Sequence, residues 1–375
     1  MKRYNVLKDG KKTFNYCDAA VGEFVYIILE NLIIMLLSVI LALGAPRTVG
    51  ISYVFSAIIE VGFVAAVLIA ARSSRTSVFA ATKLNKKITW KQAGFVVIIS
   101  ILALFGYNAL TNSFVNFFEL IGYSSSASID VSSWGIYILF VFTMAIVPAF
   151  CEELLFRGLV YQGLRKWSEK GAVFVSAALF MLMHGSPDQT IHQFILGVIL
   201  AYVVYATGSI WASMLLHFLN NFIALTISFV YSQMGIGASD AAVETAKLTW
   251  SSWFISILTG LVAAAFVSYI IYEIIKYLKK DREKKEAAKE VAAAEAAQNA
   301  EPKAVEPVAQ VVEGEAVEPI PVEKYSGELS ENIEDPEDSE VLSPRSKKVA
   351  IVLFSLAGAW LVFEWISALI SGIIK

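Results

Sequence analysis

The sequence predicts an all-α polytopic membrane protein, a bundle of about eight or nine transmembrane helices, and three observations support this fold class. Hydrophobic residues make up 57% of the 375 residues, against roughly 45–50% in an average soluble chain. Charged residues are only 17% of the chain, and they gather at a few places instead of being spread along it. Apolar runs of about 18 or more residues, long enough to cross a bilayer as a helix, recur throughout.

The apolar runs divide into nine candidate spans, placed by hydropathy and by the polar stretches between them. The fourth span is longer than a bilayer requires, whereas the fifth and sixth are short, as expected for helices that lie inside a bundle. The ninth follows a long polar tether and is expected to be an appendage to that bundle. In chain order the spans cover about 24–44, 50–71, 93–112, 134–163, 171–185, 190–206, 209–231, 251–277 and 348–374.

These spans predict a chain of five parts. An N-terminal part with three helices precedes a core of four helices, which we expect to form a conical bundle. An eighth helix, a polar linker and a last helix follow the core. The predicted boundaries of the five parts are 1–125, 126–232, 233–280, 281–346 and 347–375.

The segment 281–346 has a composition unlike that of the spans. It is rich in Ala, Glu, Val and Pro, holds six of the nine prolines, and has Tyr325 as its one aromatic residue. Such a segment lacks the apolar residues needed to build a core, so we expect a disordered acidic linker. Its first part, to about Gln298, is expected to continue the eighth span as a solvated helix.

Lysine and arginine in the short loops predict the orientation of the bundle. Basic residues crowd the first 23 residues, the loop 72–92, the loop 164–170 and the stretch after residue 277. The alternate loops hold Arg47, then none in 113–133 and 186–190, and then only Lys247 in 232–250. We therefore expect a multi-pass protein of the plasma membrane, with the N-terminus and the linker cytoplasmic and the C-terminus outside.

Some classes of protein are disfavoured by what the chain lacks. It has no concentrated basic domain of the kind that binds nucleic acid. Its two cysteines, Cys17 and Cys151, form no CxxC pair, so neither a disulfide framework nor a cysteine metal site is predicted. The oligomeric state is not legible from the sequence.

Ionisable residues inside the fourth span are the most informative feature of the sequence. The stretch VPAFCEELLFRG, residues 147–158, carries Glu152, Glu153 and Arg157 in an otherwise apolar run. Each charged group at a bilayer centre costs at least about 2.5–3.5 kcal/mol, so such residues are candidates for function. At about 1.5 Å per helical residue, Glu152, His184, His217 and Asn221 lie about 20, 21, 13 and 20 Å from the predicted cytoplasmic ends of their helices.

Helical spacing predicts which of these side chains share a face. Glu153 and Arg157 are four residues apart, so they stack on one face and neutralise each other. Glu152 lies about 100° round the helix from Glu153, which leaves its carboxylate for another contact. His217 and Asn221 also share a face, with Asn220 as an alternative to Asn221. Pro148, one turn before Glu152, removes a backbone hydrogen bond and should loosen the helix there.

A carboxylate, two imidazoles and an amide at one depth are suited to hydrolysis. A carboxylate takes a proton from water as a general base. Histidines orient that water or bind a metal ion that acidifies it. An asparagine amide donates to a developing oxyanion.

Three motifs in this region resemble those of a known family. They are EELLFR (Glu152–Arg157), FMLMH (Phe180–His184) and HFLNN (His217–Asn221), which fit EExxxR, FxxxH and HxxxN in that order. The chain resembles the CPBP family (CAAX protease and bacteriocin-processing, or Abi), and is similar to the type II CAAX prenyl endopeptidases. The resemblance covers roughly residues 130–230 and implies an intramembrane endopeptidase with a peptide or protein substrate in or at the bilayer.

The resemblance also implies roles for the residues that match the motifs. Glu152 would activate a water together with His184, while His217 and Asn221 would hold the oxyanion or complete a metal site. The structural support would come from Glu153, Arg157 and Phe180. A divalent metal such as zinc, bound by Glu152, His184 and His217, is one expectation, and a metal-free water activated by the glutamate is the other. No HExxH helix is present.

Competing interpretations accompany these assignments. Glu153 and Arg157 form an ion pair of purely structural value even in an active enzyme, and His192 is expected to be an ordinary boundary residue. Outside the core, Glu30, Glu60 and Glu364 are expected to pack against polar partners or to snorkel.

The whole chain also has competing interpretations. One is a non-catalytic scaffold, including a bacteriocin-immunity protein of the same fold. Another is a solute or proton transporter, although no repeated pair of broken-helix segments is evident. For an enzyme, lipidated proteins, pheromone peptides and bacteriocin precursors are all candidate substrates.

Overall fold

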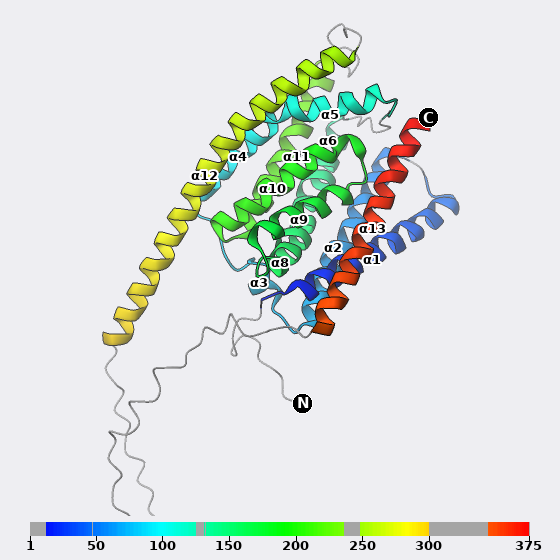
Figure 1. Cartoon of the computed structure of the whole chain (residues 1–375). Helices are drawn as coiled ribbons and strands as arrows, with labels where there is room; N and C mark the ends of the chain where they lie inside the picture. Colours follow the sequence, from blue (N-terminus) through cyan, green and yellow to red (C-terminus); the bar gives the residue numbers. More distant parts are fainter. Residues whose placement is uncertain are drawn as a thin grey trace, which may run out of the picture. The chain divides into compact units, whose positions relative to one another are not determined.

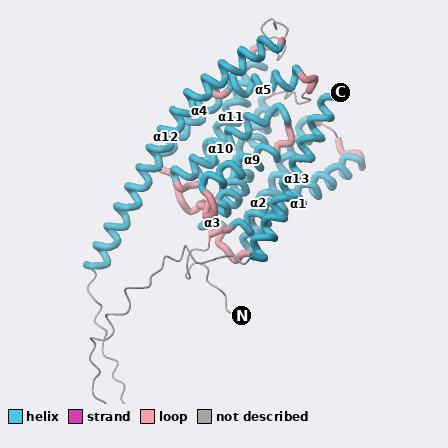
Figure 2. Tube along the Cα trace, viewed as in Figure 1, coloured by secondary structure: helices cyan, strands magenta, loops and turns pink. Residues whose placement is uncertain are grey.

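The computed structural model describes residues 13–46, 48–124, 131, 133–235, 248–299 and 344–374. Within these ranges every regular element is a helix, as Figures 1 and 2 show, so the predicted all-α fold class is confirmed. The chain divides into two compact units, one made of residues 1–282 with 343–375 and the other of residues 283–342. The candidate site lies in the first unit.

Five helices precede the core. The first, α1, begins with a capping box. The side-chain oxygen of Asn15 accepts from the backbone N–H groups of Cys17 and Asp18, and the Asp18 carboxylate accepts from the backbone N–H of Asn15. The predicted third span consists of two helices, because the helix is interrupted at Tyr107 between α4 and α5. The five helices are α1 (Tyr16–Ala42), α2 (Val49–Ser73), α3 (Val78–Ala81), α4 (Trp90–Gly106) and α5 (Asn108–Leu120).

The long fourth span is a single helical rod with two π-helical stretches in it. In chain order its segments are α6 (Trp134–Phe140), η1 (Val141–Ile146), α7 (Val147–Glu153), η2 (Leu154–Val160) and α8 (Tyr161–Leu164). A π-helix places one extra residue in a turn and occurs mostly as short bulges, often at functional sites. Both bulges here flank the short segment that ends in Glu152 and Glu153.

The rest of the core consists of α9 (Glu169–Met183), a short 3₁₀ turn η3 (Pro187–Gln189), α10 (Thr190–Thr207) and α11 (Ile210–Gln233). Among the described residues, eight helices are long and apolar enough to cross a membrane. The predicted fifth span is not one of them, because α9 has only 15 residues. It packs closely against α10 and carries fully buried Val173, Ala177 and Phe180, so it is an interior helix of the bundle.

Two long helices complete the chain, α12 (Trp250–Asn299) and α13 (Pro344–Ile374). Residues 281–299 of the predicted disordered linker are helical as part of α12, residues 344–346 begin α13, and residues 300–343 lie outside the described residues. α13 belongs to the same unit as the bundle and packs along α1, which differs from the expected appendage. The Trp365 indole donates to Thr190 at 2.9 Å, which ties α13 to the start of α10.

The surface of these helices is as apolar as their interior, which fits a lipid environment. Large apolar side chains that are mostly exposed include Val262, Phe266 and Ile351, at 72%, 66% and 64%. In water such a surface would drive aggregation, whereas in a bilayer lipid chains cover it. The chain is therefore an integral, multi-pass membrane protein.

Candidate active site

The first π-helical stretch is explained by the backbone hydrogen bond that Pro148 is unable to make. A proline has no N–H, so Pro148 does not donate to the carbonyl of Met144, four residues earlier. That carbonyl instead accepts a hydrogen bond of 2.9 Å from the side-chain amide of Asn221 on α11. A side chain from a neighbouring helix thus replaces the missing backbone bond one turn before the two glutamates.

The second π-helical stretch is held from the other side of the core. The carbonyl of Phe156, within η2, accepts the backbone N–H of Tyr161 and also the hydroxyl of Ser176 on α9, at 3.0 Å. The rod that carries Glu152 and Glu153 is therefore fixed at one bulge by α11 and at the other by α9. Such fixing limits rotation of the rod and so sets the directions of both carboxylates.

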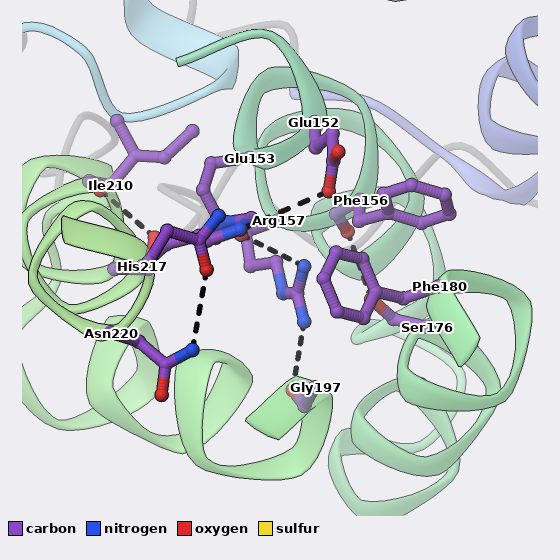
Figure 3. Close-up of polar contacts among 12 residues, drawn as sticks. Glu152, Glu153, Phe156, Arg157, Ser176, Phe180, Gly197, Ile210, His217 and Asn220 are labelled. Atoms are coloured by element: carbon purple, nitrogen blue, oxygen red, sulfur yellow. Dashed lines mark hydrogen bonds and ion pairs between the residues drawn. The ribbon is translucent and has the colours of Figure 1, made fainter. Parts of the chain in front are cut away.

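Glu153 and Arg157 form the predicted ion pair, and no solvent reaches it. The Arg157 Nη1 lies 2.9 Å from the Glu153 Oε1, and both side chains are 0% exposed. The Arg157 Nη2 donates to the backbone carbonyl of Gly197 on α10 at 3.1 Å, and Figure 3 shows the guanidinium between these two partners. A buried charge is tolerated only when it is paired and hydrogen-bonded, and both conditions hold here.

Gly197 lies at a close approach between α9 and α10. A Cβ atom at this position would lie 3.0 Å from the Cα and Cβ atoms of Ala177 and 3.3 Å from the Nη2 of Arg157. The absence of a side chain lets α9 and α10 approach closely and brings the carbonyl within reach of the guanidinium. The sequence pattern did not single out this glycine.

The Phe180 ring occupies the centre of the cluster. The guanidinium carbon of Arg157 lies 4.3 Å from its centroid. The ring centroids of His184 and His217 lie 4.9 and 5.7 Å from it, both in edge-to-face arrangements. One buried aromatic ring therefore packs against three of the predicted site residues, which gives the FxxxH motif a physical basis.

His217 contacts both glutamates. Its Nδ1 lies 3.0 Å from the Glu153 Oε1, the same oxygen that binds Arg157. Its Nε2 lies 4.0 Å from the Glu152 Oε2, and that oxygen is buried without a hydrogen-bond partner (Figure 3). Because a carboxylate accepts hydrogen bonds, Nδ1 carries the hydrogen in the neutral ring and the lone pair of Nε2 is directed to Glu152.

His184 has the same arrangement at the end of α9. Its Nδ1 lies 2.8 Å from the backbone carbonyl of Phe180, which also assigns the hydrogen to Nδ1 and leaves a lone pair on Nε2. His184 comes directly after the last residue of α9 and is partly exposed, whereas His217 lies within α11 and is 2% exposed. The two histidines thus come from different parts of the core, and both rings pack against Phe180.

The two asparagines of the third motif bond to each other and to the rod. The Asn220 amide donates to the Asn221 Oδ1 at 3.2 Å, while the Asn221 amide donates to Met144. An amide nitrogen carries two hydrogens, so the bond to Met144 leaves one for another acceptor. Asn220 is 4% exposed, and its own oxygen has no hydrogen-bond partner.

Glu60 on α2 is a neighbour of the site that sequence reasoning assigned to packing. Its side chain lies within hydrogen-bonding reach of Glu152, and its Oε2 is buried without a hydrogen-bond partner. The position of α2 beside α7 creates this pair, and no sequence spacing links two residues so far apart. Glu364, by contrast, accepts a hydrogen bond of 2.8 Å from the Trp360 indole, a polar partner of the expected kind.

The chemical types of the predicted ligands suit a metal ion, but the distances between them do not. Two imidazoles with Nδ1 engaged and Nε2 free are typical of zinc ligands, whose second nitrogen is usually hydrogen-bonded. Among the described residues, however, no three His, Cys, Asp or Glu side chains converge closely enough to hold a metal ion. In this arrangement the predicted set of Glu152, His184 and His217 does not fit zinc.

These observations define a class: a polytopic membrane protein with a buried cluster of carboxylates, imidazoles and an amide inside a helical core. Residues 133–223 match the model of a family described as Type II CAAX prenyl endopeptidase Rce1-like. This segment is therefore similar to that family, which agrees with the resemblance that the three motifs predicted, and all three motifs lie within the match. No curated protein and no solved structure matches the chain.

Proposed function

We propose that this protein is an intramembrane endopeptidase that hydrolyses a peptide bond by means of a water activated by Glu152. The observation that carries the proposal is the pair formed by Glu152 and His217. The Glu152 Oε2 and the His217 Nε2, both acceptors, lie 4.0 Å apart in a buried site. One water forming hydrogen bonds of about 2.7–3.0 Å would bridge two such atoms.

The chemistry then follows from the polarity of each group. The water oxygen attacks the carbonyl carbon of the scissile bond while Glu152 takes its proton. The attack leaves a tetrahedral intermediate with a negative oxygen, to which the second hydrogen of the Asn221 amide donates. When the intermediate collapses, the carbon–nitrogen bond breaks, and Glu152 returns its proton to the leaving amine.

The remaining residues hold this geometry. Glu153, neutralised by Arg157, accepts from Nδ1 of His217 and so keeps the lone pair of Nε2 directed at the water. The free Nε2 of His184 would accept a hydrogen bond from the substrate, with its ring held by Phe180. A carboxylate that orients an imidazole in this way is common in hydrolases.

The substrate that best suits this site is a protein or peptide anchored in the membrane. A lipidated C-terminal tail of the CAAX type, a pheromone precursor and a bacteriocin precursor all satisfy that condition. The distribution of Lys and Arg favours cleavage near the cytoplasmic face of the plasma membrane.

A zinc-dependent form of the proposal would require Glu152, His184 and His217 to move closer together than they lie in this arrangement. Metal analysis of active protein combined with chelator treatment separates the two forms. Stoichiometric metal with loss of activity on chelation supports the zinc site, and activity without metal supports the glutamate-activated water.

The proposal is tested by cleavage of a lipidated reporter peptide by the purified protein in liposomes. Glu152→Gln and His184→Ala should each reduce the rate by about 100-fold or more, the usual contribution of a general base. Glu364→Gln is the matched control, since it also removes a carboxylate within a membrane helix, and it should retain the wild-type rate. Full activity in the Glu152 and His184 variants would refute the assignment.

A further inference from the structure

A second feature of the bundle lies away from the buried cluster, between α10 and the part of α12 that belongs to the first unit. It is an open groove with a cavity volume of about 640 Å³. This volume is within the roughly 300–1,000 Å³ typical of sites for small molecules. The family match ends at residue 223, so α12, which forms one whole wall, lies outside it.

The middle of the groove is apolar. Val198 and Ile199 on α10 face Ile271 and Ile275 on α12 across it. On α12 the lining residues recur every three or four positions from Ser268 to Lys279, which is one face of the helix over about 16 Å. A groove of this length suits a hydrocarbon chain that lies parallel to the helices.

One end of the groove is basic. Lys170, Lys276 and Lys279 line this end. The Nζ of Lys279 lies 4.7 Å from the centroid of Tyr205, which also lines the groove. The acidic residue among the lining groups, Glu169, lies 3.4 Å from Arg165 and also accepts from the Tyr161 hydroxyl. Lys276 lies 3.4 Å from Glu273. Together with Arg165, the three lysines still outnumber these two carboxylates, so the net charge at this end is positive.

The other end is polar but uncharged and leads toward the candidate active site. The Tyr107 hydroxyl and the Ser268 hydroxyl lie 2.8 Å apart and join α12 to the break between α4 and α5. Tyr107 and Ile199 line both the groove and a small neighbouring cavity whose wall includes Asn220. An apolar groove with one cationic end and one neutral end matches an anionic amphiphile.

We propose that this groove binds one anionic phospholipid, with its phosphate at the three lysines and one acyl chain between α10 and α12. The bilayer supplies this ligand at the membrane surface, where basic residues attract anionic headgroups. A peptide is a poorer match, because the apolar middle of the groove offers few partners for its backbone groups. The proposal does not depend on the proposed protease activity.

The test uses the full-length protein, delipidated and placed in micelles of a neutral detergent. Native mass spectrometry counts the lipids retained after titration with phosphatidylglycerol or with phosphatidylcholine, and thermal unfolding measures the stabilisation that binding produces. We expect one retained phosphatidylglycerol per chain and a saturable rise in Tm. Phosphatidylcholine and inorganic phosphate should have little effect.

Two sets of variants locate the site. Lys170→Gln, Lys276→Gln and Lys279→Gln together should weaken phosphatidylglycerol binding by roughly 100-fold, because each lysine near a membrane contributes about fivefold. The matched control changes three exposed lysines outside the groove, Lys86, Lys87 and Lys166, and should stay within about threefold of wild type.

Ile275→Trp keeps the three lysines but fills the apolar part of the groove, so it should abolish retention of the lipid. Equal retention by wild type and the groove variants, an equal loss in the control, or stabilisation by inorganic phosphate alone would each overturn the proposal.

Discussion

Replacing Arg157 with methionine removes one half of an ion pair in which both side chains are 0% exposed. Removing one partner of a buried pair costs about 3–5 kcal/mol, because the other charge is left unpaired away from water. The carbonyl of Gly197 also loses its side-chain donor, for which about 1 kcal/mol is a reasonable addition. We therefore expect Arg157→Met to lower the free energy of unfolding by about 4–6 kcal/mol.

The double variant with Glu153→Gln and Arg157→Met separates the charge from the packing. The glutamine oxygen still accepts from the His217 imidazole, and no charge is left unpaired. The double variant should therefore lose only about 1–3 kcal/mol and be more stable than the Arg157 single variant. Unfolding is measured by far-UV circular dichroism while dodecylsulfate is titrated into dodecylmaltoside micelles.

Arg165→Met is the control for this measurement. Arg165 also pairs with a glutamate four residues away, Glu169, but both side chains are 32% exposed. A partly exposed pair contributes about 1 kcal/mol or less. If Arg157→Met cost no more than Arg165→Met, or if the two losses in the double variant simply added, the account of the buried pair would be refuted.

Two more predictions concern backbone contacts. Asn221→Ala should lower the free energy of unfolding by about 1–3 kcal/mol, because the Met144 carbonyl loses its donor. In a Pro148→Ala background, which restores a backbone N–H, the same change should cost less than about 1 kcal/mol. Equal losses in both backgrounds would contradict this. Gly197→Ala should lower stability by about 1–3 kcal/mol, because its Cβ would press against Ala177; a thermal unfolding midpoint equal to that of wild type would show that α9 and α10 adjust without strain.

Much of the fold could be predicted because a bilayer makes strong demands on sequence. Each span must satisfy its backbone polar groups internally, so a long apolar run is a helix, and eight described helices meet that requirement. The fifth span was counted among the nine candidates, but its shortness predicted a helix inside the bundle, and α9, with 15 residues, is such a helix. Hydropathy does not distinguish lipid from a protein interior.

The end of α12 and the position of α13 show two different limits. The alanine- and glutamate-rich stretch after Arg282 favours helix by local propensity, so the extension of α12 to Asn299 was predictable. The packing of α13 along α1 was not, because it depends on which apolar surfaces meet after a long intervening segment.

For the candidate site, the sequence determined which side chains pair along one and the same helix. Glu153 with Arg157, and His217 with Asn221, follow from a spacing of four residues, and the three motifs together predicted the family match. The chemical types of the cluster and its approximate depth were also readable from sequence, because ionisable groups in apolar spans are rare.

Only the tertiary structure decided which atoms face each other between helices. It placed His217 4.0 Å from Glu152 and 3.0 Å from Glu153, turned the Asn221 amide to Met144, and brought Glu60 beside Glu152. These contacts depend on helix rotation and approach, which Pro148, Gly197 and the two π-helical stretches set. Local spacing fixes neighbours along one helix, whereas packing between helices depends on the shape of every side chain at the interface.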